Sequence, residues 1–217
     1  MYKPLQIAIT SLLQHNTIEH LYVLALENEL PFPVPCPHTV INVSGQTYFP
    51  PGCPNVSNRF TVMSPIRVCI PDLIAEPKAI VLDVDLVVCD TLQPLWDIDI
   101  TGKWLAWCPE YKATWNPFGH ASYYNMGVVV MNLDQMRRDH AVTIMVNELN
   151  NNRFEYAEQD CFNKIAVPDL TTDIPVRFNE SFCCGYTDRP AIVHFAGYMD
   201  FLTNPARFRW EYIRPYL

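Results

Sequence analysis

Apolar residues recur along the chain in two patterns, one typical of helices and one typical of strands. IAITSLLQH, at residues 7–15, has apolar residues at helical spacing, and HLYVLAL, at residues 20–26, has the character of a strand. HTVINV, at residues 38–43, is a second strand candidate, and it follows an extended connection in which four prolines fall between Pro31 and Pro37. The pattern therefore predicts that the chain opens with a helix followed by strands.

The segment KAIVLDVDLVV, residues 78–88, is a nearly continuous apolar run of strand length. Such a run predicts a strand buried on both faces of a largely parallel sheet, which helices must then cover on both sides. A helix is expected over residues 64–76, with a kink or break at Pro71. Further predicted elements are strands at 104–108, 126–133 and 191–197 and helices at 134–150 and 158–166. This alternation predicts an α/β fold with ligands at the carboxyl ends of the strands.

Composition and charge narrow the range of partners. With 217 residues that are 49% hydrophobic, the chain is large enough to bury a core as one domain. A formal net charge of -8 disfavours bulk nucleic acid and anionic membranes, although a bound cation can reverse the field inside a single cleft. No apolar run is long enough to span a bilayer, and the N-terminus lacks the features of a signal peptide. We therefore expect a cytoplasmic protein.

The eight cysteines lie scattered in apolar contexts without a repeated C-x-x-C spacing. This distribution favours reduced core thiols over a zinc ribbon or a disulfide scaffold. Three Asn-x-Ser matches begin at Asn42, Asn55 and Asn179, but a pattern of three residues is weak and means little without secretion.

Asp83 and Asp85 interrupt the most apolar predicted strand. An unpaired buried charge is costly, so such carboxylates shift their pKa and become neutral or acquire a cation partner. With one residue between them in an extended chain, both side chains face the same way and can share one divalent cation. D-x-D is nevertheless a short pattern, and the same pair could cap a strand end or pair with an arginine.

Five motifs occur in order along the chain: KAIVLDVDLVVCDTLQPLWDIDITGKWLAW, YYNMGVVVMNLDQMR, EQDCFNKI, RFN and IVHFAG. Together they resemble glycosyltransferase family eight, the glycogenin and lipopolysaccharide galactosyltransferase group, over most of residues 5 to 200. The resemblance implies the GT-A fold, a nucleotide-binding α/β sandwich with a mostly parallel central sheet and helices on both faces, in a single domain over residues 1–217. It also implies a retaining transfer of a hexose from a nucleotide-diphosphate sugar, UDP-glucose or UDP-galactose, to an acceptor that the sequence does not identify.

The resemblance also assigns a metal site. Asp83 and Asp85 correspond to the acidic pair that holds manganese against the donor diphosphate, and His194 corresponds to the third ligand. Magnesium is an alternative to manganese, and imidazole suits a transition-metal ion. Both carboxylates, with Val84 between them, also belong to the implied donor-binding set. Arg67 falls where the family places an arginine near the donor sugar and phosphates, which a guanidinium can hold bidentately.

Further donor contacts follow from the resemblance alone. Asn125 matches a position that hydrogen-bonds the donor sugar, and Met126 replaces the small residue that usually follows, which would reshape the sugar pocket. Glu158 and Gln159 match catalytic positions beside the reacting carbon, with Gln159 facing the anomeric carbon. Gly197 completes the implied donor-binding set.

Two departures from the family pattern concern the ends of the chain. Tyr2 matches the aromatic residue that stacks on uracil, but the nucleoside-binding strand that precedes this point is not in the sequence, as a late start codon, a truncation or a genuine loss would explain. Asp200 stands where the family usually has a lysine, six residues after the histidine. Within residues 198–217, expected to form a C-terminal tail or lid, Arg207 and Arg209 are the candidates to supply the missing positive charge.

Three other functions are alternatives to a glycosyltransferase. A catalytically impaired relative that still binds nucleotide sugars is the main alternative, favoured by Asp200 and by the absent strand. A sugar-1-phosphate nucleotidyltransferase would open on a glycine-rich phosphate loop, which we do not find in a chain with seven glycines. A glycosidase is disfavoured because Asp83 and Asp85 are too close in sequence to flank a sugar from two sides. Formation of a homo-oligomer is left open.

Overall fold

The structure is a computed structural model that describes residues 2–56, 61–111, 116–198 and 200–217. The chain begins with α1 (Lys3–His15), and β1 (Leu21–Ala25) then pairs in parallel with β2 (His38–Asn42). Proline in the first turn suits the start of α1, and its buried residues, among them Ile9 and Leu12, recur at helical spacing. The predicted order of a helix followed by two strands is confirmed.

Four strands form the central sheet, in the order β3 (Lys78–Leu82), β6 (Tyr124–Asn132), β5 (Leu105–Pro109) and β7 (Thr171–Asp173). β6 runs antiparallel to both β3 and β5, whereas β5 and β7 are parallel. The α/β class is confirmed, but the central sheet is mixed and not mostly parallel. A parallel neighbour needs a crossover, and the described part of the connection from β5 to β6 contains no helix.

The strand predicted over residues 78–88 is in fact two strands in different sheets. β3 ends at Leu82, and β4 (Leu86–Val88) pairs antiparallel with β8 (Ile192–His194) in a separate two-stranded sheet. The intervening residues are the partly buried carboxylates Asp83 and Asp85 and, between them, Val84, whose side chain is exposed. Asp83, Val84 and Asp85 therefore lie at the seam where the chain passes from one sheet to the other.

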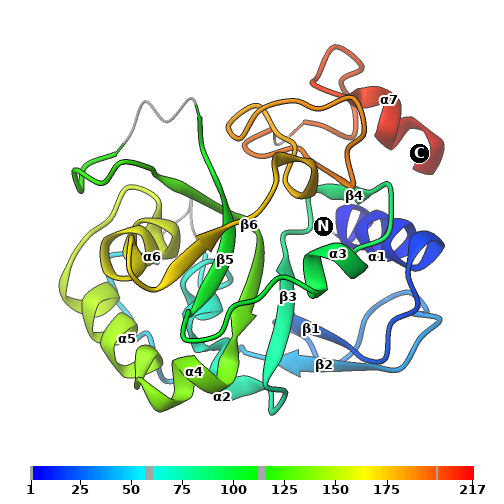
Figure 1. The fold of residues 1–217 in the computed structure, drawn as a ribbon. Helices are drawn as coiled ribbons and strands as arrows, with labels where there is room; N and C mark the ends of the chain where they lie inside the picture. Colours follow the sequence, from blue (N-terminus) through cyan, green and yellow to red (C-terminus); the bar gives the residue numbers. More distant parts are fainter. Residues whose placement is uncertain (1, 57–60, 112–115, 199) are drawn as a thin grey trace.

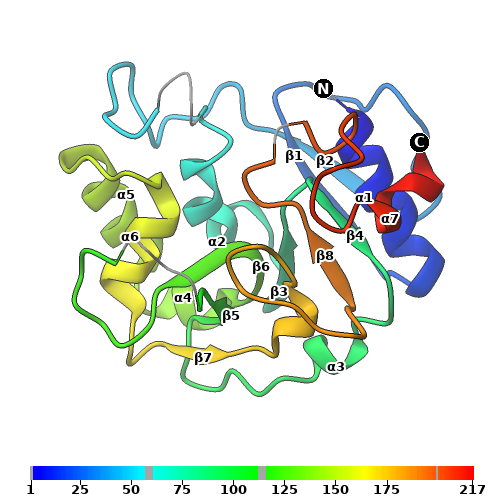
Figure 2. The same ribbon diagram turned by 90° about the horizontal axis from the view of Figure 1, so that it is seen from above.

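Helices cover the strands on both sides, as predicted. Figure 2 shows α5 (Ala141–Asn151) and α6 (Ala157–Ala166) on one side and α1 and α7 (Trp210–Ile213) on the other. Alternate residues of β6 pack on opposite sides of the sheet. Val129 and Met131 join the apolar cluster that contains residues of α5 and α6, whereas Val128 and Val130 join the cluster that contains residues of α1. α3 (Gln93–Trp96) packs on the same side as α1.

Two predicted helices are interrupted. Residues 64–76 form a 3-10 helix, η1 (Pro65–Cys69), and then α2 (Ile70–Leu73), where Pro71 occupies the first turn that a proline tolerates. Residues 134–150 divide into α4 (Leu133–Arg138) and α5, and His140 between them has a left-handed φ of 55°. The predicted break at the proline is thus confirmed, and the prediction of one continuous helix over 134–150 is wrong.

One side chain of α4 organises the segment between α2 and β3. The guanidinium of Arg137 donates hydrogen bonds to the backbone carbonyls of Pro71, Ile74, Ala75 and Glu76 at 2.7–3.2 Å. The last carbonyls of a helix have no partner within it, so a side chain that reaches them stabilises the exit from α2. The approach of the chain to β3 is therefore held by a helix that comes much later in the sequence.

β1 and β3 contribute to the same apolar clusters without being hydrogen-bonded to each other. Leu24 packs into the cluster that contains Val81, and Leu21 packs into the cluster that contains Ile80. No backbone hydrogen bond joins the two strands in the part of the chain that the structure describes. Every residue of β3 is only partly buried, although its sequence predicts burial on both faces. β3 is thus paired with β6 along one edge and open along the other.

The C-terminal segment is packed against the small sheet. Phe201 and Ile213 are buried in a cluster with Val87, Val193 and Phe195. The segment contains α7 and ends in η3 (Arg214–Tyr216). Figure 1 shows it, in red, above α1. Residues 200–217 therefore form an integral layer and not a loose tail.

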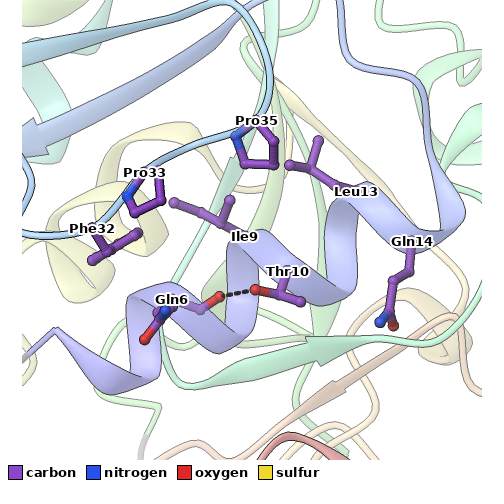
Figure 3. Close-up of a pocket in the computed structure, with 8 residues that line it drawn as sticks. All are labelled: Gln6, Ile9, Thr10, Leu13, Gln14, Phe32, Pro33 and Pro35. Atoms are coloured by element: carbon purple, nitrogen blue, oxygen red, sulfur yellow. Dashed lines mark hydrogen bonds between the residues drawn. The ribbon is translucent and has the colours of Figure 1, made fainter.

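A hollow of about 250 Å³ lies between α1 and the proline-rich connection (Figure 3). Its walls are mainly apolar, and the hydroxyl of Thr10 already donates to the carbonyl of Gln6. The lining residues are Gln6, Ile9, Thr10, Leu13, Gln14, Phe32, Pro33 and Pro35. They include no acidic, basic or thiol group and none of the predicted site residues.

All eight cysteines are free in the structure. Among the described residues, no helix combines the length and the apolar character that a membrane crossing requires.

Candidate active site

The three predicted metal ligands meet at the seam between the sheets. Pairing of β4 with β8 brings His194 opposite Leu86, next to Asp85. The Nε2 atom of His194 lies 3.4 Å from Oδ1 of Asp85 and 3.6 Å from Oδ2 of Asp83, and one ligand atom from each residue lies within 4.8 Å of the others. Two carboxylate oxygens and one imidazole nitrogen in this arrangement fit a divalent ion such as Mn²⁺.

The charges of these three residues depend on one another. Burial acts to lower the pKa of His194, but Asp85 and Asp83 outweigh it and raise the pKa to about 9. Burial raises the pKa of Asp83 despite the opposing charge of Arg67. Burial also acts to raise the pKa of Asp85, yet the charge and hydrogen bond of His194 hold that pKa below its usual value. A metal ligand must be unprotonated, so a cation could bind to His194 only with release of the histidine proton.

Arg67 joins Asp83, one of the candidate metal ligands, to Glu158. Its Nη1 atom donates to Oδ1 of Asp83 at 2.7 Å and lies 3.5 Å from Oε1 of Glu158, and its Nη2 atom donates to the carbonyl of Met126. Ser64, three residues earlier at the start of η1, donates to the other oxygen of Glu158. Burial raises the pKa of Glu158 in spite of these two partners. The structure therefore brings two predicted residues, Arg67 and Glu158, to the metal-ligand cluster.

Asn125 and Gln159 converge on Glu110, a carboxylate that the sequence did not single out. The Nδ2 atom of Asn125 donates to Oε1 of Glu110 at 2.9 Å, and Nε2 of Gln159 lies 3.4 Å from the same oxygen. The Oε1 atom of Gln159 accepts from the backbone N–H of Met126 at 3.0 Å. Burial raises the pKa of Glu110. The only sequence signal for Glu110 was its place just after a predicted strand, at a carboxyl end where ligands bind.

Gly127 makes room for the imidazole of His194. A Cβ atom at this position would lie 2.0 Å from Cε1 and 2.4 Å from Nδ1 of the ring. Gly127 is also fixed in place, because its carbonyl accepts from the backbone N–H of Asp83 at 2.8 Å. The glycine at this position is therefore required by the ring and not by its own backbone conformation.

Three predicted donor-binding residues are placed outside this group of contacts. The ring of Tyr2 lies edge-on to Phe32, with centroids 6.4 Å apart, and its hydroxyl is hydrogen-bonded to Glu27. Val84 is exposed between the two carboxylates. Gly197 has a φ of 78° in a turn three residues after His194, and a Cβ at this position would have no atom within 4 Å.

The two arginines of the C-terminal segment are used in ion pairs within the protein. Arg207 pairs with Asp200 itself, at 2.7 Å, where both side chains are about 40% exposed. Arg209 donates to Oε1 of the fully buried Glu180 at 2.6 Å. Asp200, which stands in place of the usual lysine, is thus neutralised by its neighbour, and the idea that these arginines extend over a bound diphosphate has no support in their contacts.

Residues 53–199 match the family described as glycosyl transferase family 8. The chain belongs to this family. The matched residues contain Asp83, Asp85, Asn125, Gln159 and His194, so the resemblance inferred from the five motifs is confirmed.

Solved structures of glycosyltransferases show the same fold as this family 8 protein. An active-site mutant of LgtC superposes with a TM-score of 0.77 at 20% identity, covering 99% of this chain and 91% of LgtC. The galactosyltransferase LgtC in complex with donor and acceptor sugar analogues superposes with a TM-score of 0.74 at 21% identity over the same shares. GlyE of Streptococcus pneumoniae TIGR4 gives a TM-score of 0.71 at 18% identity, covering 99% of this chain and 58% of GlyE. The predicted GT-A architecture is confirmed.

Two curated relatives match parts of the family 8 sequence. A Haemophilus influenzae protein assigned as a glycosyltransferase is 36% identical over 99 residues, which are 41% of this chain and 30% of that protein. General stress protein A of Bacillus subtilis is 25% identical over 170 residues, which are 65% of this chain and 59% of that protein. The chain thus matches less than two thirds of the length of either relative.

Proposed function

We propose that this family 8 protein is a retaining glycosyltransferase that moves a hexose from UDP-glucose or UDP-galactose to an acceptor. The observation that carries the proposal is the clustering of Asp83, Asp85 and His194, together with Arg67, which pairs with both Asp83 and Glu158. The likeness to LgtC, a galactosyltransferase crystallised with donor and acceptor sugar analogues, supports the same class of reaction.

Each residue of the cluster has a proposed role. Asp83, Asp85 and His194 would hold Mn²⁺, or Mg²⁺ in its place, which when bound supplies Lewis-acid activation of a diphosphate leaving group. Arg67 holds the Asp83 carboxylate and adds positive charge for the donor phosphates. Asn125 binds the donor sugar. Glu158 and Gln159 lie beside the reacting carbon.

A screen of nucleotide sugars tests the reaction itself. The protein is incubated with Mn²⁺ and a panel of donors while released nucleotide diphosphate is measured, and release from a UDP-hexose is expected. The alternative of a catalytically impaired relative is favoured by Asp200 and by the open edge of β3. It predicts that a donor binds without any release.

Donor binding is expected to require the cation. Calorimetric titration of UDP should show at least tenfold weaker binding without Mn²⁺, because the diphosphate would then approach Asp83 and Asp85 without the divalent charge that offsets both. Asp85→Asn, which removes one charge from the ligand set, should abolish most of the dependence on Mn²⁺. Asp90→Asn is the matched control, since Asp90 is an exposed carboxylate just beyond β4 that pairs with Arg177. Equal UDP affinity of the unaltered protein with and without Mn²⁺ would contradict the metal site.

A further inference from the structure

Asn179 lies between the metal-ligand cluster and Asn125. It directly follows η2 (Val176–Phe178) and is fully buried. Its Oδ1 atom lies 2.9 Å from Nδ1 of His194, and its Nδ2 atom donates to Oδ1 of Asn125 at 3.0 Å. No site role was predicted for Asn179 from the sequence, where it belongs only to the RFN motif and to a weak Asn-x-Ser match.

The orientation of these side chains is set by a backbone group. The N–H of Gly127 can only donate, and it donates to Oδ1 of Asn125 at 2.9 Å. The same Oδ1 therefore cannot face another acceptor, so Asn179 must present its amide nitrogen to it. The carbonyl oxygen of Asn179 then faces His194, whose Nδ1 must carry the hydrogen.

This chain of hydrogen bonds determines which imidazole nitrogen is available to a cation. With the hydrogen on Nδ1, the lone pair of the neutral ring is on Nε2, the atom 3.4 Å from Asp85 and 3.6 Å from Asp83. A hydrogen bond to the other ring nitrogen is what commonly fixes the tautomer and the ring plane of a metal-binding histidine.

We propose that Asn179 is a positioning residue that holds His194 in the Nδ1–H tautomer and couples that ring to Asn125. The proposal rests on the proposed function, because it takes His194 as a cation ligand and Asn125 as a contact of the donor sugar. The two polar atoms of its side-chain amide serve two purposes: the carbonyl oxygen orients the metal ligand, and the nitrogen orients the sugar contact. Loss of one can therefore be separated from loss of the other.

Two substitutions make that separation. Asn179→Leu has a similar shape and removes both hydrogen bonds, so affinity for Mn²⁺ should fall about 10- to 100-fold, as is typical when such a partner is lost. Asn179→Asp keeps an acceptor for the Nδ1 hydrogen but places a carboxylate against Oδ1 of Asn125. Its affinity for Mn²⁺ should therefore be retained, while its affinity for UDP-hexose in the presence of Mn²⁺ should fall on the order of tenfold.

Asn55→Leu is the matched control. Asn55 is another buried asparagine, and it bonds the backbone at the end of α5 and not the site. This variant should lose stability in the same way as Asn179→Leu and should bind Mn²⁺ like the unaltered protein. Free Mn²⁺ is measured by electron paramagnetic resonance, and folding of each variant is checked by thermal melting.

A second readout needs no metal. The Nδ1–H of His194 should appear as a slowly exchanging proton resonance in the unaltered protein and in Asn179→Asp, and should be lost in Asn179→Leu. Equal Mn²⁺ affinity of Asn179→Leu and the unaltered protein, or a protected Nδ1–H in Asn179→Leu, would overturn the proposal. A protein that shows the protected proton but binds no Mn²⁺ would support the role of Asn179 on the ring and contradict the proposed function instead.

Discussion

Replacing Gly127 with alanine is expected to abolish the cation site while the fold persists. The new Cβ would lie 2.0 Å from the ring of His194, which is too close for two non-bonded carbon atoms. Gly127 cannot move away, because β6 holds it between paired neighbours. The ring must therefore leave the position where Nε2 faces Asp83 and Asp85. Overpacking of this kind also costs about 1–3 kcal/mol of folding free energy.

Mn²⁺ affinity is determined from the concentration of free Mn²⁺, and the free energy of unfolding is determined by urea denaturation. We expect the affinity for Mn²⁺ to fall by on the order of 100-fold or more. This is a larger loss than removal of a residue that only hydrogen-bonds to a metal ligand would cause. Gly45→Ala is the control, because nothing lies within 4 Å of a Cβ at that position and its φ is not positive. Undiminished Mn²⁺ binding by Gly127→Ala would mean that His194 is not a ligand.

Replacing Arg209 with alanine is expected to destabilise the protein strongly. Glu180 is fully buried, and its carboxylate accepts from Arg209 at 2.6 Å. Removing one partner of a buried ion pair leaves an uncompensated charge and costs about 3–5 kcal/mol. The loss would reach the site, because the backbone carbonyl of Glu180 accepts from the N–H of His194 at 2.8 Å.

Arg207→Ala is the matched control in urea denaturation. Arg207 pairs with Asp200 at the surface, so its loss should cost only about 0–1 kcal/mol. Two variants two residues apart, with the same change of charge, should therefore differ by several kcal/mol in the free energy of unfolding. Equal losses would show that the Arg209–Glu180 pair is no more important than a surface contact.

The features that could be picked out from the residues alone are those whose signal is local. The apolar runs at 104–108 and 126–133 predicted β5 and β6, because a strand that is buried on both faces has a nearly continuous run of apolar residues. Asp83 and Asp85 stood out because charge in such a run is unusual. His194 and Arg67 came from the family resemblance, since a lone histidine or arginine carries no comparable local signal.

The residues that were missed act through contacts between distant segments. Asn179 and Glu110 are ordinary polar residues in sequence, and they matter only because folding brings them to His194 and Asn125. The change of sheet at Asp83 was missed for a related reason: an apolar run shows that a segment is buried, but not which strands pair with it. Pairing depends on β6 and β8, which occur much later in the chain.

The contacts of Arg137 have a consequence for the order in which the chain can become structured. During synthesis, residues 71–76 leave the ribosome more than sixty residues before the guanidinium that binds their carbonyls. Until then those carbonyls can bond only to water, so the approach to β3 cannot take its final course. Closing a loop of this length costs entropy before any contact compensates for it. The strand that leads to Asp83 is therefore among the first parts of the family 8 domain to be made and cannot be fixed in place until α4 has followed.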